Sequence, residues 1–370
     1  MSMVAFDKNI VTAMHNKNIK ILVISDAWHP QVNGVVRTYE HLSTVLAADG
    51  HRMDVIGPAD FPRRIGLPGY SEIELALFPY RRLRTLMASH QDADHIHIAT
   101  EGPLGKAARR YCLRRGRRFT TAYHTHFPDY LARRVQKYLP PLAAPARHIA
   151  IAALRRFHNA SNGIIIATQS LEDALRAWDF KAPLYRVSRG ADLALFRPAT
   201  GDKKHYADLP RPVALYVGRI AIEKNLEDFL AMEWPGGKAV IGDGPDKAML
   251  ESRFPDARFY GTKKGDELAA YFRDADLFVF PSRTDTFGMV IVEALASGLP
   301  VAGYQVMGPK DIITLPVLGA LHDSDLAQAA RLAISHDGGA AERHDHVRTH
   351  YTWPVVARHF LDALAQAEHR

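Results

Sequence analysis

Two carboxylates stand eight residues apart in the segment Ser282 to Val301, where an apolar run gives way to a helical pattern. Asp285 falls in the loop after the apolar run, and Glu293 falls on the expected helix. Carboxylates in these places can accept hydrogen bonds from sugar hydroxyls, while N–H groups near Phe287 to Met289, with Gly288 at the helix start, can face an anion. An acid near a helix start is also commonly a cap, so spacing alone leaves both interpretations open.

Two cations follow another apolar run, Val213 to Val217. Arg219 comes two residues after the run, and Lys224 comes five residues later at the expected start of a helix. Because both would lie in a loop at the carboxyl end of a strand, they suit a diphosphate better than they suit packing. An ion pair between Lys224 and Glu223 or Glu227 is the alternative.

Gly34 lies in the loop after the apolar run Lys20 to Ser25 and opens a helical pattern. A residue without a Cβ lets a phosphate approach the free N–H groups and the positive end of the helix dipole. The full G-x-G-x-x-G pattern is absent, and no acid follows the second strand where one would hold a ribose. A turn glycine therefore remains the alternative.

These residues require a scaffold that brings strand ends together, and strand-like runs do alternate with helical patterns along the chain. The first series contains Lys20 to Ser25, Met53 to Ile56, His95 to Ile98, Phe119 to Tyr123 and Gly163 to Ala167. The second contains Val213 to Val217, Ala239 to Ile241, Arg258 to Tyr260, Leu277 to Phe280 and Pro300 to Ala302. The alternation predicts an α/β fold with two parallel sheets covered on both faces, whose ligands bind beyond the carboxyl ends of the strands.

The segment from Phe196 to Pro212 contains three prolines and no periodicity, which is typical of a linker between domains. We therefore expect a first Rossmann-like domain over residues 1–196, a linker over 197–212 and a second Rossmann-like domain over 213–352. A terminal helix is expected from Trp353 onward, and residues 353–370 are assigned to the first domain.

Length and composition are those of an ordinary globular protein: 370 residues, 47% hydrophobic and 24% charged. The longest strictly apolar stretch, Ile149 to Leu154, is far shorter than the roughly 18 residues that span a bilayer. Asp7 and Lys8 interrupt the place where a signal peptide would have its apolar core. The single cysteine, Cys112, allows no internal disulfide. We expect a cytoplasmic protein that is neither secreted nor membrane-spanning.

Positive charge is concentrated in residues 101–160, which carry 13 Lys or Arg against two acids. The net +11 of this segment leaves −4 for the rest of a chain whose total is +7. Such asymmetry favours a polyanionic partner, either a membrane surface or a nucleic acid. Solvated helix faces are the plainer alternative.

Several segments together resemble the retaining glycosyltransferases of family 4, over roughly residues 20–335. They are the loop DAWHPQVNGVVRTYEHL, the stretches VGRIAIEKN and RGADLALF, the turn from Gly242 to Pro245 and the two-carboxylate segment, in which Asp285 replaces the usual Glu. The resemblance implies a GT-B architecture, with two Rossmann-like domains facing a cleft that holds a nucleotide sugar and a final helix that crosses back to the first domain.

The resemblance also implies a role for each matched residue. Arg219 and Lys224 would neutralise the departing diphosphate, and the backbone at Gly34 would approach it. Asp285 and the backbone from Phe287 to Met289 would hold the hydroxyls of the donor sugar. Glu293 would hold the nucleotide ribose.

Two histidines follow the run Phe119 to Tyr123, and the resemblance places His124 near the reacting face of the sugar. From the residues alone, His124 and His126 would be core histidines or metal ligands. We expect no bound metal or cofactor, because the family works without one. Asp274 and Asp276 spell D-x-D but precede a buried run, and His344, His346 and His350 suit a solvated helix better than a zinc site.

Within the family, the stretch TDTFG resembles the branch that contains sulfoquinovosyl and diacylglycerol glycosyltransferases and GDP-mannose-dependent mannosyltransferases. The stretch YHTHFPDY resembles bacterial synthases of glucosyl or glucuronosyl diacylglycerol. The expected reaction is transfer of a hexose or hexuronic acid, from a UDP-sugar by preference, to a membrane lipid such as diacylglycerol. The alternative is a GDP-mannose-dependent mannosyltransferase acting on a lipid-linked or soluble saccharide. The sequence lacks the residues that an epimerase or a phosphorylase of this architecture would need.

A lipid acceptor would require the protein to sit peripherally on the inner face of the cell membrane. Basic residues that alternate with Leu131, Ile149, Ile151, Leu154 and Phe157 are typical of an interfacial amphipathic segment. The basic residues assigned to this contact are Arg133, Arg134, Lys137, Arg147, Arg155 and Arg156. A nucleic-acid partner is disfavoured, because residues 101–118 offer only one aromatic side chain, Tyr111, for stacking on bases.

Overall fold

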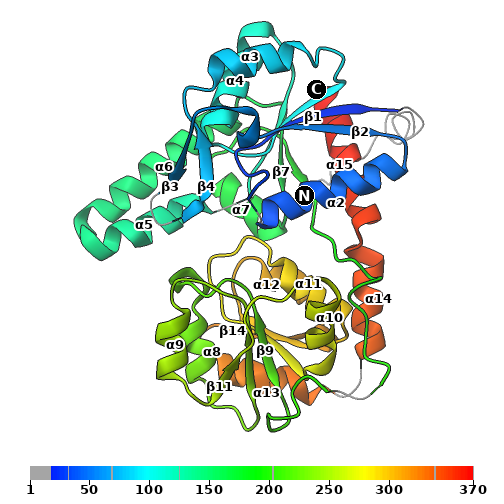
Figure 1. Cartoon of the computed structure of the whole chain (residues 1–370). Helices are drawn as coiled ribbons and strands as arrows, with labels where there is room; N and C mark the ends of the chain where they lie inside the picture. Colours follow the sequence, from blue (N-terminus) through cyan, green and yellow to red (C-terminus); the bar gives the residue numbers. More distant parts are fainter. Residues whose placement is uncertain are drawn as a thin grey trace. The chain divides into compact units, whose positions relative to one another are not determined.

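The computed structural model describes residues 18–31, 33–67, 70–124, 126–201, 204–336 and 339–369. The chain forms two compact units. Unit 1 comprises Met1–Ser188 and Val356–Arg370, and unit 2 comprises Arg189–Val355. Each unit is built around its own sheet (Figure 1).

Unit 1 contains a six-stranded sheet in the order β2-β1-β5-β6-β7-β8, and every neighbouring pair is parallel. Its strands are β1 (Lys20–Ile24), β2 (Arg52–Ile56), β5 (His95–Ile98), β6 (Thr120–Ala122), β7 (Gly163–Ile166) and β8 (Leu184–Arg186). An antiparallel pair, β3 (Arg64–Leu67) and β4 (Tyr70–Ala76), stands outside it.

The helices of unit 1 are α2 (Gly34–Ala48), α3 (Tyr80–Ala88), α4 (Pro103–Arg115), α5 (Phe127–Tyr138), α6 (Ala143–His158) and α7 (Gln169–Ala177). The last helix of the chain, α15 (Trp353–Glu368), contributes all but its first residues to the same unit. One core joins Ile96 and Ile98 of β5 to α3 and α4. His97 points to the opposite face, where it meets α2 and α15, because successive strand side chains alternate. Helices thus cover both faces of this sheet.

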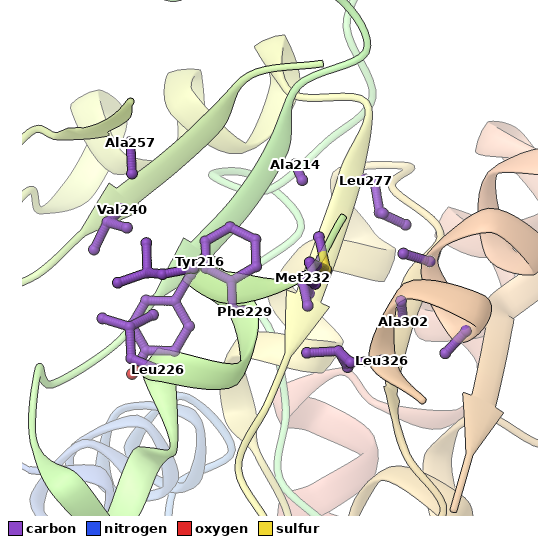
Figure 2. Packing of buried hydrophobic residues seen from close by; sticks show 14 of the residues in the cluster. Ala214, Tyr216, Leu226, Phe229, Met232, Val240, Ala257, Leu277, Ala302 and Leu326 are labelled. Carbon is purple, nitrogen blue, oxygen red and sulfur yellow. The ribbon is translucent and has the colours of Figure 1, made fainter. Parts of the chain in front are cut away.

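Unit 2 repeats the design with a sheet in the order β11-β10-β9-β12-β13-β14, again parallel throughout. Its strands are β9 (Ala214–Val217), β10 (Lys238–Ile241), β11 (Ala257–Phe259), β12 (Leu277–Phe280), β13 (Val301–Tyr304) and β14 (Gly319–His322). Its helices are α8 (Leu226–Ala231), α9 (Lys247–Arg253), α10 (Gly265–Asp274), α11 (Met289–Ala296), α12 (Pro309–Ile312), α13 (Leu326–Ser335) and α14 (Ala340–His350). Figure 2 shows one of its cores, in which Tyr216 and Phe229 pack with Leu226 and Val240.

The expected α/β fold with two Rossmann-like domains is confirmed. The sequence patterns missed the short edge strands β8 and β14 and the pair β3–β4. Within the segment expected to be a linker, Tyr206 is buried and its hydroxyl donates to the Tyr271 carbonyl at 3.0 Å, so this segment packs on α10 of unit 2.

Both sheets have a point where the strand order reverses, which is where open α/β sheets bind ligands. In unit 1 it lies between β1 and β5, and in unit 2 it lies between β9 and β12. The loops that leave these four strands carry most of the residues discussed below.

Candidate functional site

The reversal point of unit 2 brings together two residues from separate motifs. Lys224 ends a short 3₁₀ turn, Ile222–Lys224, after β9, and Asp285 lies in the loop after β12. The Lys224 Nζ is 2.6 Å from Asp285 Oδ1 and 2.9 Å from Oδ2. Lys224 therefore pairs with Asp285, while Glu227 pairs with Arg253 at 2.7 Å.

Arg219 lies in the same loop as Lys224, and buried contacts fix the backbone there. The Tyr216 hydroxyl donates to the Arg219 carbonyl at 2.8 Å. Burial, reinforced by the charges of Asp285 and Glu223, raises the pKa of Tyr216, so this donor stays protonated. The turn that begins at Gly242 packs so closely that a Cβ on this glycine would lie 1.9 Å from the Gly218 carbonyl oxygen. Two motifs singled out in the sequence thus form one rigid edge.

Helix α11 begins at the same edge, and its N-cap residue is a glycine, which has no side chain to cap the first turn. Its N-cap residue is Gly288, with φ 95°, a left-handed conformation that favours glycine. No side-chain oxygen of this N-cap residue accepts from the first turn, so the N–H groups from Met289 onward present the positive end of the helix dipole. Phe287 is buried beneath the loop, and Glu293 is buried on the helix with 6% of its surface exposed. The structure thus gathers Lys224, Asp285 and the start of α11 at one edge.

Gly34 is the first residue of α2, as expected, but this helix is already capped. The Asn33 side chain accepts hydrogen bonds from Val35 N at 3.0 Å and from Val36 N at 3.1 Å. A phosphate at Gly34 would have to share or displace this cap. The role of Gly34 stays a prediction.

The reversal point of unit 1 holds a carboxyl group that the sequence patterns did not single out. Asp26 follows β1 and accepts hydrogen bonds from Leu104 N at 2.8 Å and Gly105 N at 3.2 Å, the first turn of α4. Thr100 adds a third at 2.9 Å. Asp26 is 6% exposed, and burial raises its pKa although these hydrogen bonds oppose the rise. The chain thus supplies its own cap at this helix start.

His124 lies just beyond β6 and is partly buried. Its Nε2 is 3.1 Å from the Tyr39 hydroxyl of α2, which also lies 2.7 Å from His97 Nε2. His126 stacks on Trp178 at 4.7 Å and pairs with Asp129 at 2.9 Å.

The basic segment spans α4 to α6, and α5 and α6 lie side by side (Figure 1). The side chains of Arg133, Arg134 and Lys137 lie outside the described part of the chain. Arg147 pairs with Asp129 at 2.5 Å, and Arg155 lies 3.9 Å from Asp179. Arg156 is exposed.

The apolar partners expected for this basic segment behave differently from one another. Ile151, Leu154 and Phe157 are at most 9% exposed and pack inside unit 1, so their assignment to an interfacial face was wrong. They face the interior because they share one face of α6. Ile149, in contrast, is 70% exposed, and Leu139 and Leu142 are more than half exposed at the α5–α6 turn.

The rejected metal patterns have structural uses. Asp274 accepts from the backbone N–H groups of Lys204 and His205, and Asp276 accepts from Arg211 at 2.7 Å. His344 lies on α14 with its Nδ1 2.6 Å from the Ala296 carbonyl oxygen. Within the described ranges, no three His, Cys, Asp or Glu side chains gather where they could hold a metal ion.

Comparison with known families decides the class of the protein. Residues 32–195 match the description "Glycosyltransferase Family 4", and residues 211–336 match "Glycosyl transferases group 1". The chain belongs to glycosyltransferase family 4. It is a glycosyltransferase, as the resemblance in its sequence predicted.

Relatives of this glycosyltransferase act on different substrates. It is 28% identical to the GDP-mannose-dependent alpha-mannosyltransferase of Mycobacterium tuberculosis, over 80% of this chain and 82% of that protein. It is 32% identical to the sulfoquinovosyl transferase of Arabidopsis thaliana, over 70% of this chain and 51% of that protein. It is 27% identical to the alpha-monoglucosyldiacylglycerol synthase of Acholeplasma laidlawii, over 76% of this chain and 79% of that protein.

Solved structures confirm the GT-B type of fold. Sucrose-phosphate synthase from Thermosynechococcus elongatus matches with a TM-score of 0.71 at 20% identity, over 92% of this chain and 96% of that chain. At this identity the likeness concerns the fold alone. No helix in the described part of the glycosyltransferase is both long and apolar enough to cross a bilayer.

Proposed function

We propose that this glycosyltransferase moves a hexose or hexuronic acid, from a UDP-sugar by preference, to a membrane lipid such as diacylglycerol, with retention of the α configuration. The observation that carries the donor half is the Lys224–Asp285 pair, in the loops that carry Arg219 and the start of α11 at Gly288. Unit 2 would hold the nucleotide sugar, and unit 1 would hold the acceptor.

Charge at the leaving diphosphate is the main catalytic problem of this reaction. The acceptor oxygen bonds to the anomeric carbon, the bond from that carbon to the diphosphate oxygen breaks, and the hydroxyl proton passes to the leaving phosphate on the same face. Arg219 and Lys224 would neutralise the growing negative charge. Lys224 has three N–H donors, of which Asp285 uses two, so one remains for a phosphate oxygen.

The neighbouring groups would hold the sugar and the ribose. Asp285 can accept further hydrogen bonds while it holds Lys224, because two carboxylate oxygens offer about four acceptor positions. We therefore assign Asp285 and the backbone from Phe287 to Met289 to the sugar hydroxyls, and Glu293 to the ribose. His124 is assigned to the reacting face of the sugar. We assign no role to a metal or cofactor, because cations and N–H groups can serve the diphosphate.

The lipid acceptor is supported by two observations. Relatives named for glucosyldiacylglycerol synthesis and sulfoquinovosyl transfer match most of this chain. In addition, the α5–α6 turn, with exposed Leu139 and Leu142, lies within the basic segment of residues 101–160. Apolar tips flanked by cations suit the anionic surface of a membrane, where each Lys or Arg contributes about 1 kcal/mol. We infer a peripheral position on the cytoplasmic leaflet.

A donor screen tests the proposal. Purified protein is offered UDP-glucose, UDP-glucuronate, UDP-galactose and GDP-mannose with diacylglycerol in anionic liposomes, with and without EDTA. We expect glycolipid from one UDP-sugar, undiminished by EDTA. Transfer only to a soluble saccharide would overturn the lipid acceptor, and activity that EDTA abolishes and Mg²⁺ or Mn²⁺ restores would overturn metal independence.

The second candidate is mannosyl transfer from GDP-mannose to a lipid-linked or soluble saccharide. It is favoured by the mycobacterial relative, which matches 80% of this chain. Product from GDP-mannose alone in the same screen would select it.

A further inference from the structure

A buried chain of hydrogen bonds runs through unit 1 and reaches His124. Thr120 Oγ1 lies 2.8 Å from His97 Nδ1, and His97 Nε2 lies 2.7 Å from the Tyr39 hydroxyl. The same hydroxyl lies 3.1 Å from His124 Nε2. Thr120, His97 and Tyr39 are at most 4% exposed, so water does not compete for these bonds.

Three different elements hold the chain in place. Tyr39 comes from α2, His97 from β5 and Thr120 from β6. Phe360 of α15 packs edge-on against the His97 ring at 5.4 Å and is itself 1% exposed. The Tyr39 hydroxyl is thus fixed in position against the His124 ring rather than rotating on a surface.

Each histidine ring nitrogen in the chain can donate or accept, and we assign the direction from the two distances to the Tyr39 hydroxyl. A hydroxyl that donates makes a bond typically near 2.7 Å, whereas an N–H donor makes a longer one, up to about 3.2 Å. The 2.7 Å contact therefore suits Tyr39 donating to His97 Nε2, and the 3.1 Å contact suits His124 Nε2–H donating to the Tyr39 oxygen. Neutral His97 then carries its proton on Nδ1 and donates it to Thr120.

We propose that Tyr39 is a positioning residue that holds His124 as the tautomer with its proton on Nε2 and its lone pair on Nδ1. A sugar hydroxyl that meets Nδ1 must then donate its hydrogen. The link to catalysis rests on the proposed function, in which His124 serves the sugar, whereas the tautomer itself does not.

The tautomer can be measured without any substrate. The full chain is labelled with ¹⁵N-histidine, and the two ring nitrogens of His124 are read from long-range ¹H–¹⁵N spectra, with His124→Gln to assign the signal among the 19 histidines. We expect protonated Nε2 and unprotonated Nδ1 in the neutral ring. In Tyr39→Phe, which removes only the hydroxyl, we expect a mixture of tautomers.

A second variant keeps the test decisive where Tyr39→Phe fails to fold. Thr120→Val removes the hydroxyl bonded to His97 Nδ1, which should weaken the preference of His97 for a proton on Nδ1 and shift His124 toward its other tautomer. The matched control is Tyr206→Phe in unit 2. It also deletes one buried tyrosine hydroxyl, which in this case donates to the Tyr271 carbonyl. An unchanged His124 tautomer in both Tyr39→Phe and Thr120→Val would overturn the proposal.

Kinetics then test whether the tautomer matters for transfer. In Tyr39→Phe we expect kcat to fall about tenfold, the factor that corresponds to one neutral hydrogen bond, with KM for the donor changed less. Tyr206→Phe should leave both unchanged. A shifted tautomer with unchanged kcat would overturn the link to catalysis. If no donor in the screen is active, the proposed function fails, while the spectra still decide the tautomer.

Discussion

Each Rossmann-like unit has a helix that begins at the reversal point of its sheet, but the two helix starts differ in the groups that meet their first N–H donors. In unit 1 the first turn of α4 is closed by Asp26, which accepts two backbone N–H groups and lies 6% exposed. In unit 2 the N-cap residue of α11 is Gly288, which has no side chain to cap the first turn, and Lys224 pairs with Asp285 at the same edge. The chain itself satisfies the first edge, and we expect the second to bind an anion.

This difference shows that two units with the same fold can suit different ligands. An anion entering the crevice of unit 1 would have to displace Asp26 from α4, and at α2 it would meet Asn33 on Val35 and Val36. We therefore expect unit 1 to hold mainly the uncharged acceptor hydroxyl and unit 2 to hold the diphosphate. Variants of each unit, assayed for both lipid binding and donor turnover, test this division.

The largest expected effect is on membrane binding by unit 1. Changing Arg133, Arg134, Arg155 and Arg156 together to Glu removes about 4 kcal/mol of attraction to an anionic surface before any repulsion is counted. We expect loss of co-sedimentation with anionic vesicles and of lipid glycosylation, with donor binding retained. Wild-type binding should weaken with salt, because the field decays within about 8 Å at physiological ionic strength.

The control makes the same change in charge on unit 2, at exposed residues away from the site: Arg253, Arg258, Arg331 and Arg348 to Glu. This variant should still bind the vesicles. If both variants lose binding equally, total charge rather than the basic segment is responsible, and if neither does, the segment is ordinary solvated surface.

The next largest effect is on turnover by unit 2. Lys224→Ala and Arg219→Ala should each lower kcat by about 100- to 1,000-fold, which corresponds to roughly 3 to 4 kcal/mol of lost stabilisation of the leaving charge. Vesicle binding should be unchanged. Arg253→Ala is the matched control, because it breaks a surface ion pair with Glu227 at the far end of α9. Near-normal kcat in both site variants would contradict the assignment of the diphosphate.

Much of this comparison could be predicted from the sequence, because it depends on local patterns. Short strand-like runs located β1, β5 and β12 almost to the residue, and the residues that follow such strands must lie at the carboxyl edge. Asp285 and Lys224 were selected in this way. β8 was missed because Leu184–Arg186 is short and half-exposed, which leaves little pattern to detect.

The partners of these residues could not be predicted, because they are distant in sequence. Lys224 and Asp285 are 61 residues apart, and Asp26 and Leu104 are 78 apart. Tyr39 fell within the apolar pattern of α2, so it was indistinguishable from a core residue until His97 and His124 were placed beside it. Contacts of this kind depend on strand order, which local periodicity does not contain.

A smaller effect is expected on the stability of unit 1 when its cap is removed. Asp26→Ala leaves the first N–H groups of α4 without their acceptors and should cost about 2 kcal/mol. Amide hydrogen exchange of α4 measures this loss locally. Asp325→Ala, which removes an exposed cap with a single bond to Gln328 N at 2.8 Å, should cost about 1 kcal/mol in α13. Equal losses at the two helices would contradict a special role for the buried cap.

The smallest effect concerns the acid that restrains the basic segment of unit 1. His126 and, after it, Arg147 hold the pKa of Asp129 down to about 2. A carboxyl whose folded pKa is lowered stabilises the protein above its unfolded value near 3.8, and this stabilisation is lost as pH falls toward 2. Because Asp129 is more than one-third exposed, we discount the contribution to about 1 kcal/mol.

Asp129→Asn should therefore lower the free energy of unfolding by about 1 kcal/mol at pH 7, and the deficit should shrink by pH 3, measured by hydrogen exchange in α5 and α6. Asp173→Asn is the control, because the Asp173 side chain accepts from the uncharged Gln169 amide at 2.8 Å. A deficit that is the same at both pH values would mean that the ionisation of Asp129 does not stabilise the fold, and it would contradict the prediction. The ion pair with Arg147 would then add nothing measurable to the stability of α5 and α6, as is common for exposed pairs.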